Sequence, residues 1–194
     1  RKRNIFIILT IALASALLSA IVLYGFGVMQ ETQNRNQKTA QIMYHAISEQ
    51  QGQELYKQEE IAWVGEFFNA FSEQVNHSTV NFTYANADML TSQSMPYSGD
   101  LPASENEIVV QESFLDSLGY SNELGQTIQI PFSDGTTHDF KLTGILDVKT
   151  GDIGRYTAII SKELVRQQYG DGGMIDYYIG LKGAQNMSEE EATN

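Results

Sequence analysis

The sequence predicts an α+β fold: one N-terminal transmembrane helix followed by a domain of short strands and helices. Ile5 to Met29 contains 25 consecutive residues without a charge. After residue 38, short segments alternate apolar and polar residues, which is the pattern of half-buried strands. Helical segments between them end at Gly119 and Gly170, and glycine suits the position that follows a helix C-terminus. Together these signals predict a mixed domain on a membrane anchor.

The uncharged segment predicts a membrane-spanning helix. At about 1.5 Å per residue it extends roughly 37 Å, which exceeds the roughly 30 Å hydrocarbon core of a bilayer. A cleaved signal peptide is the alternative, but its apolar region usually has about 7–15 residues and no A-x-A site precedes Gln30. Residues 1–3 are basic, and positive charge stays in the cytoplasm. We therefore expect residues 1–4 as a cytoplasmic tail, residues 5–29 as the helix in the cell membrane, and the main domain outside.

One face of this helix carries small residues. Ala12, Ala16 and Ala20 recur at every fourth position. In lipid, small residues allow a second helix to approach closely, so these three alanines are candidate helix-packing residues. Small residues are also common in membrane helices generally, and the spacing alone does not separate the two readings.

The charge of the chain is uneven. All 24 acidic residues and nine of the 12 basic residues lie after residue 30, which gives that part a net charge of −15. Such a domain repels phosphate backbones, so no nucleic acid partner is expected, and it also repels an anionic membrane surface. Cysteine is absent, which excludes disulfides and thiolate metal ligands.

The first part of the outer domain contains clear and ambiguous segments. Residues 30–39 are polar and fit a stalk, and residues 39–48 predict a strand buried on both faces. Residues 49–60 predict a polar helix with Leu55 and Tyr56 turned inward.

Two apolar segments follow this helix. Residues 61–71 fit both the face of a helix and a strand, and their pattern does not decide between them. Val80, Phe82 and Tyr84 alternate with polar residues and predict a strand.

The middle of the chain is predicted to be rich in strands. We expect strands at residues 107–110, 128–132 and 140–146, and a short helix at residues 113–118. Asp134-Gly135 between two alternating segments predicts a hairpin turn with Gly135 at positive φ. The remaining elements predict a β-α-β unit: a strand at 156–160, a helix at 161–169 and a strand at 177–181.

The ends of the chain suggest further sequence. Ser188 followed by three glutamates predicts the capped start of a helix, so we expect the protein to continue beyond Asn194. No initiator Met precedes Arg1.

No catalytic or metal-binding motif is present. His45, His77 and His138 have no second histidine at ligand spacing, and the sequence contains neither a G-x-S-x-G elbow nor a P-loop. We therefore expect a protein that is not an enzyme, with no metal and no cofactor, whose domain binds, couples or transmits.

Several passages, in their order, resemble the MacB/FtsX-type ABC transporter permease family, and within it the Gram-positive members. The basic start and apolar helix through Tyr24-Gly25-Phe26-Gly27 are similar to the first helix of that family. Residues 99–110 resemble the family passage G-x-L-P-x-x-x-x-E-I-V, and residues 114–120 followed by 124–128 resemble the part that contains L-G-x-x-I. Residues 140–146, which read F-K-L-T-G-I-L, resemble its F-x-V-V-G-I-L strand, and Tyr44-His45-Ala46 is similar to Gram-positive members. Each passage alone is weak, and their order and spacing carry the resemblance.

The resemblance implies an extracytoplasmic two-lobe domain. Its α/β lobe would comprise residues 30–95, stalk included, and residues 153–194, and its β-rich insert residues 96–152. It also implies that residues 61–71 are at least partly strand.

The resemblance also implies partners and a function. Three more membrane helices would follow, and a separate ABC ATPase subunit would drive two permease copies, as a homo- or heterodimer in the lipid bilayer. The outer domain would transmit ATP-driven motion to export or to extracellular cargo. The alternative is a membrane-anchored sensor with a ligand-binding outer domain; a single further span followed by a kinase or coiled coil would favour it.

Overall fold

The computed structural model describes residues 15–28, 30, 38–148, 155–170 and 175–183. Residues 39–182 form one compact unit, and residues 1–38 and 183–194 belong to another. The elements in chain order are β1 (Ile42–Tyr44), α2 (Glu49–Leu55), β2 (Ile61–Val75), β3 (Ser78–Ala85), α3 (Ala87–Ser92), β4 (Tyr97–Gly99), β5 (Glu107–Gln111), α4 (Glu112–Leu118), β6 (Thr127–Pro131), β7 (Thr137–Leu146), β8 (Arg155–Ile160), α5 (Lys162–Tyr169) and β9 (Asp176–Leu181).

The N-terminal segment is helical where it is described. Residues 15–28 form a helix in which Ala16 and Ala20 are exposed, whereas Ala12 lies outside the described residues. Within the part of the chain that the structure describes, no helix has both the length and the apolar composition needed to cross a bilayer. The predicted span at residues 5–29 and the helix-packing role of the three alanines stay predictions.

The strands of the compact unit form one mixed sheet. Its order is β1-β9-β2-β3-β8-β5-β7-β4, and β6 pairs with β7. The β3–β8 and β5–β7 pairs are parallel and the others antiparallel. The chain therefore has the predicted α+β class.

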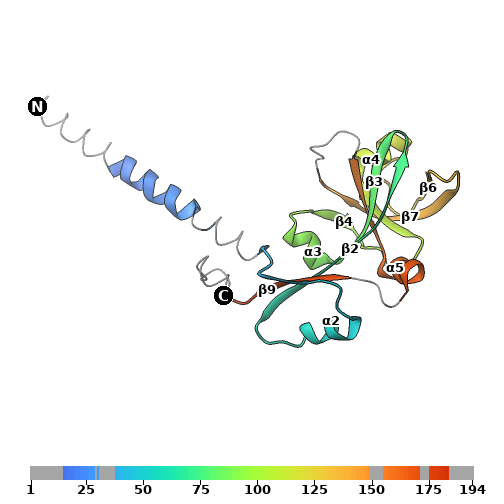
Figure 1. The fold of residues 1–194 in the computed structure, drawn as a ribbon. Helices are drawn as coiled ribbons and strands as arrows, with labels where there is room; N and C mark the ends of the chain where they lie inside the picture. Colours follow the sequence, from blue (N-terminus) through green and yellow to red (C-terminus); the bar gives the residue numbers. More distant parts are fainter. Residues whose placement is uncertain (1–14, 29, 31–37, 149–154, 171–174, 184–194) are drawn as a thin grey trace, which may run out of the picture. The chain divides into compact units, whose positions relative to one another are not determined.

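The two faces of the sheet are covered differently. Phe82 and Ile160 belong to the largest apolar cluster, where they meet side chains from α4 and α5. On the other face, Ile159 packs with Met89 and Leu90 of α3. Figure 1 shows α3 and α5 on opposite sides of the long strands β2 and β3.

The ambiguous segment at residues 61–71 is a strand. Neighbouring residues of β2 serve opposite faces: Phe67 packs with the α3 cluster, and Phe68 packs with the largest cluster. The strand period therefore prevails over the helical period, as the family resemblance suggests. A register shift between Asn69 and Phe71 marks a bulge, which bends this long strand.

The prediction for residues 39–48 is wrong in part. Only Ile42–Tyr44 is a strand, and all three of its side chains are 38–45% exposed. Because β1 is the edge of the sheet and pairs with β9 alone, its alternating apolar residues are not covered on both faces.

Helix α2 is shorter than the predicted residues 49–60. Ser48 and Gln51 form a capping box at its start, and the helix ends at Leu55. Leu55 packs inward as expected. Tyr56 is 47% exposed although its hydroxyl donates to the buried Glu66, so its predicted burial is wrong in part.

The predicted hairpin and the later elements are confirmed. Strands β6 and β7 pair across the turn that contains Gly135, whose φ is +86°. Ile128 and Ile130 lie in the same cluster as Phe140 and Leu142. Gly119 has φ +78° after α4, and the β8-α5-β9 unit follows the predicted order.

The β-rich insert shares its sheet and its core with the rest of the domain. Strand β5 pairs with β8, with Ile108 opposite Ile160, and the largest cluster joins side chains from both segments. The structure thus does not show the insert as an autonomous lobe. The predicted boundary at residue 152 lies outside the described residues, and the lobe bounds stay a prediction.

Candidate functional site

The two ends of the compact unit lie side by side at one edge of the sheet. Strands β1 and β9 are antiparallel, and the Gln41 amide donates to the Ile179 carbonyl over 2.8 Å. The Leu181 amide in turn donates to Oε1 of Gln41 over 2.8 Å. Both points at which the domain continues into the other parts of the chain therefore belong to one pair of strands.

Strand β9 is held against β2 along its whole length. The pairing runs from Leu181 opposite Ile61 to Asp176 opposite Phe67. A Cβ at Gly180 would overlap the indole of Trp63, so glycine is required where this ring crosses the strand. A displacement of the two chain ends would therefore act directly on β2, the longest strand.

A buried carboxylate lies behind this edge. Glu66 of β2 is 4% exposed. It accepts hydrogen bonds from the hydroxyl of Tyr84 over 2.5 Å and from that of Tyr56 over 3.0 Å. Nζ of Lys162, at the start of α5, is 3.0 Å from the same carboxylate. A buried charge needs this kind of pairing, because its desolvation is costly.

The pair extends to a second carboxylate on α2. Nζ of Lys162 is 3.4 Å from Oε1 of Glu49, which also pairs with the guanidinium of Arg166. Burial alone would raise the pKa of Glu49, but the two cations together hold this pKa below its ordinary value. We call Glu49, Glu66, Lys162 and Arg166, with the hydroxyls of Tyr56 and Tyr84, the Glu66 cluster.

The Glu66 cluster keeps its tyrosines neutral. Burial, and next the negative charge of Glu66, raise the pKa of both Tyr56 and Tyr84. The cluster joins α2, β2, β3 and α5, which are far apart in the sequence. Such an arrangement suits a fixed connection between elements.

Tyr177 of β9 lies next to this cluster. Among the described residues, its hydroxyl is a buried side-chain group without a hydrogen-bond partner. Burial and the nearby Glu66 and Glu49 raise the pKa of Tyr177 to about 12. Its ring occupies the space beside Gly52 of α2, where a Cβ would overlap it.

Asn86 links this region to α3. Its amide oxygen accepts from the Glu66 backbone amide over 3.0 Å and caps α3 by accepting from Met89 over 2.9 Å. Its amide nitrogen donates to the Val64 carbonyl over 2.8 Å. The start of α3 is thereby fixed to β2.

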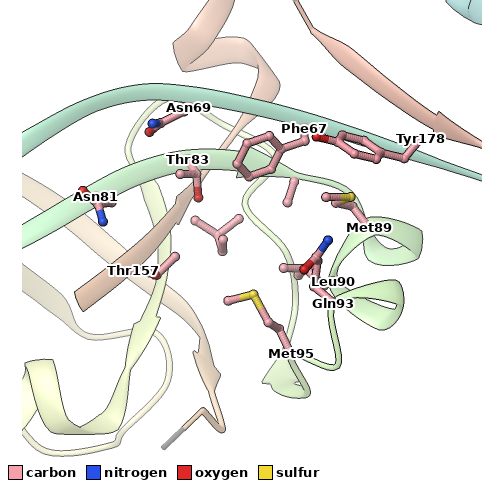
Figure 2. A pocket seen from close by; sticks show the side chains of 12 residues that line it. Phe67, Asn69, Asn81, Thr83, Met89, Leu90, Gln93, Met95, Thr157 and Tyr178 are labelled. Carbon is pink, nitrogen blue, oxygen red and sulfur yellow. The ribbon is translucent and has the colours of Figure 1, made fainter. Parts of the chain in front are cut away.

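A pocket lies between α3 and the face of the sheet on which α3 packs, and Figure 2 shows it from close by. Its volume is about 400 Å³. The sheet side is formed by β2, β3 and β8, and the opposite side by α3 and the turn after it. The lining residues are Phe67, Asn69, Asn81, Thr83, Ala85, Met89, Leu90, Gln93, Met95, Thr157, Ile159 and Tyr178.

The three histidines lie apart from one another. His45 follows β1, and its Nδ1 is 3.0 Å from the Asp176 carboxylate. His77 lies in the turn between β2 and β3. His138 lies on β7, and its ring packs against that of Phe132. In the described ranges, no three His, Cys, Asp or Glu side chains come together as metal ligands would.

Sequence reasoning missed both the Glu66 cluster and the pocket. One signal for the cluster was present: Glu66 is a single charged residue inside the apolar stretch from Ile61 to Phe68. Its partner Lys162 is 96 residues away in the sequence, so no local sequence pattern predicts the ion pair between them.

Comparisons with known proteins give one family. The model of the family described as the MacB-like periplasmic core domain matches residues 5–192. The comparison with curated proteins finds no match.

Two solved structures share the fold. The periplasmic region of MacB from Actinobacillus actinomycetemcomitans has a TM-score of 0.52 at 15% identity, covering 77% of this chain and 71% of that one. The extracellular domain of the noncanonic ABC-type transporter YknZ from Gram-positive bacteria has a TM-score of 0.53 at 11% identity, covering 75% and 80%. At these identities the likeness concerns the fold.

Proposed function

Because the chain belongs to the family of MacB-like periplasmic core domains, we propose that it is part of a permease subunit whose outer domain transmits ATP-driven movement across the membrane. In this proposal residues 39–182 are extracytoplasmic. The movement reaches them through the two chain ends and is delivered to exported or extracellular cargo.

The observation that carries the proposal is the position of the two chain ends. Residue 41 pairs with residues 179 and 181, so both connections act on one edge of the sheet. Strand β9 passes any displacement to β2, and the Glu66 cluster ties β2 to α2, β3 and α5. Movement of this edge is thereby carried into the body of the domain, because interlocked strands and buried ion pairs resist local deformation.

The proposal includes the membrane anchor. The uncharged residues 5–29 are long enough to span, and the basic residues 1–3 favour a cytoplasmic N-terminus. The similar domains of MacB and YknZ are described as periplasmic and extracellular, respectively. A location outside the cell membrane also suits the net charge of −15 after residue 30.

The proposal also includes partners. In this proposal a separate P-loop ATPase supplies the energy, and residues 1–194 contain no P-loop. Two permease copies, alike or different, would form the transporter, and Ala12, Ala16 and Ala20 offer a face on which another membrane helix could pack.

Purification of the full-length protein from its native membranes tests this function. We expect a P-loop ATPase to co-purify in a fixed ratio and to hydrolyse ATP. Co-purification of a sensor kinase, or of no ATPase under mild detergent conditions, would favour the sensor alternative. A protease added to intact cells should cleave after residue 30 and leave the N-terminus intact, and the opposite pattern of protection would contradict this orientation.

A further inference from the structure

The pocket between α3 and the sheet has a polar floor on three neighbouring strands. Asn69 of β2 is opposite Thr83 of β3, and Asn81 of β3 is opposite Thr157 of β8. All four line the pocket. A sheet face that only packs against a helix is normally apolar, as the other face of these strands is.

These polar groups are not satisfied by the domain itself. Thr83 is 6% exposed. Its hydroxyl lines the pocket and makes no hydrogen bond to any of the described residues. The side chains of Asn69, which is exposed, and Thr157, which is half-buried, also make no hydrogen bond with the described residues, and water can reach both. Asn81 accepts one hydrogen bond, from the Ser72 hydroxyl over 2.7 Å, which leaves its amide N–H groups available. Buried polar groups usually have partners, so a nearly buried hydroxyl that opens onto a pocket points to a ligand.

Most of the remaining lining is apolar. Met89, Leu90 and Met95 come from α3 and the turn after it, and Phe67 and Tyr178 come from β2 and β9. Figure 2 shows Met95 extending toward Thr157. Methionine side chains are flexible and polarisable, and they suit surfaces that adapt to different apolar groups. The volume of about 400 Å³ is within the range of small-ligand pockets.

The lining is uncharged in a strongly charged molecule. None of the described residues that line the pocket is acidic, basic or histidine. A ligand with a formal charge would lose hydration without gaining a partner there. The lining therefore favours a ligand without a formal charge.

We propose that this pocket binds an uncharged, peptide-like ligand that carries an apolar side chain. The carboxamides of Asn69, Asn81 and Gln93 offer a donor and an acceptor side by side, which is the complement of a peptide group. The apolar side chain lies against Phe67 and the methionines. This inference goes beyond the transmission of movement and needs no ATPase partner for its test.

The test uses the methyl groups of the methionines in the chain 1–194, held in lipid nanodiscs. The probe is N-acetyl-phenylalaninamide, followed by NMR with ¹³C-methyl methionine. Met89 and Met95 report on the pocket, and Met43 of β1 is the internal control. We expect saturable shifts of the two pocket methyl signals and none at Met43. Shifts at all three positions, or no shift, overturn the proposal.

Two further probes test the ligand class. N-acetyl-phenylalanine has the same apolar group with a carboxylate and should bind at least tenfold more weakly. Benzyl alcohol lacks the amides and should also bind more weakly. Equal binding of the anionic probe would overturn the claim of a neutral ligand, and equal binding of benzyl alcohol would overturn the claim of a peptide-like one.

Matched variants test the polar floor. Thr83→Val keeps the shape of the side chain and removes its hydroxyl, and it should weaken binding of the amide probe severalfold. Thr137→Val, at an exposed position on β7 outside the pocket, should leave binding unchanged. Unchanged binding in Thr83→Val, with the signals of a folded domain, would contradict the role of this hydroxyl.

Discussion

Replacing Lys162 by methionine should destabilise the domain more than an ordinary substitution of lysine. Methionine approximates the length of the stem and removes the amine, which is 3.0 Å from Glu66 and 3.4 Å from Glu49. Glu49 keeps its pairing with Arg166. Glu66, whose side chain is 5% exposed, keeps only the hydroxyls of its tyrosine partners and loses its cation.

The size of the effect follows from this burial. Removing one partner of a buried ion pair costs about 3–5 kcal/mol. We expect about 3 kcal/mol, because the tyrosine hydroxyls remain and the Lys162 side chain is 19% exposed. In the double variant Glu66→Gln/Lys162→Met no unpaired charge is buried, so the cost should fall to roughly 1–2 kcal/mol. The double variant should therefore be more stable than Lys162→Met alone.

Urea unfolding of the chain in detergent micelles measures these values. Trp63, the one tryptophan of the chain, lies on β2 against β9 and reports through its fluorescence. The control is Lys57→Met, which removes an exposed pair with Glu54 and should cost less than about 1 kcal/mol. The reasoning is refuted if Lys162→Met resembles this control, or if the second substitution simply adds to the first.

Three further predictions concern single residues. Gly135→Val should lower the free energy of unfolding by about 1 kcal/mol or more, because valine is strained at the φ of +86° that Gly135 adopts. No atom lies within 4 Å of a Cβ at this position, so the effect reports the backbone strain alone, and an unchanged urea midpoint would contradict it. Tyr177→Phe removes a buried hydroxyl without a described partner, so it should preserve stability or raise it by up to about 3 kcal/mol. The pKa of Tyr177 is about 12 in the folded protein and roughly 10 in the unfolded chain, so the wild type should lose stability as the pH rises from 10 to 12. The Tyr177→Phe variant should lose up to about 1.4 kcal/mol less per pH unit, and an equal loss of stability per pH unit in both proteins would contradict this prediction. Ala16→Leu should uncouple ATP hydrolysis by the partner from transport with the outer domain still folded, whereas Leu18→Phe on the opposite face should be tolerated; wild-type coupling in Ala16→Leu would show that the small face has no packing role.

Local signals explain why much of the fold was predictable. The hairpin is predicted from Asp134-Gly135 between alternating segments, and α5 from the glycine that follows it; the structure adds Ser161 as the cap of this helix. These features depend on neighbours in the sequence, and the structure has them where they were expected. The segment at residues 61–71 has both periods, and only its pairing with β3 and β9 decides for the strand.

Features that depend on distant pairing were not predictable. The exposure of β1 follows from its place at the sheet edge, which its own residues do not encode. The pocket requires Asn69, Thr83 and Thr157 to meet on three strands, and this depends on the parallel pairing of β3 with β8. The Glu66 cluster likewise joins segments that no local pattern connects.

The movement of the outer domain during ATP hydrolysis tests the central proposal most directly. Residues 1–194 contain no cysteine, so Glu123→Cys, at an exposed position, provides the one spin-label site in this part of the chain, and any cysteine elsewhere in the full-length permease is replaced by serine. Pulsed EPR would compare the distance between copies without nucleotide and with ATP and vanadate, in complex with the ATPase. We predict a shifted distance distribution. We also predict that flexible Gly/Ser linkers inserted at both chain ends of the compact unit, between Lys38 and Thr39 and between Lys182 and Gly183, abolish the shift while ATP hydrolysis continues. An unchanged distribution in an active complex, or a shift that survives the linkers, would contradict transmission through this edge of the sheet.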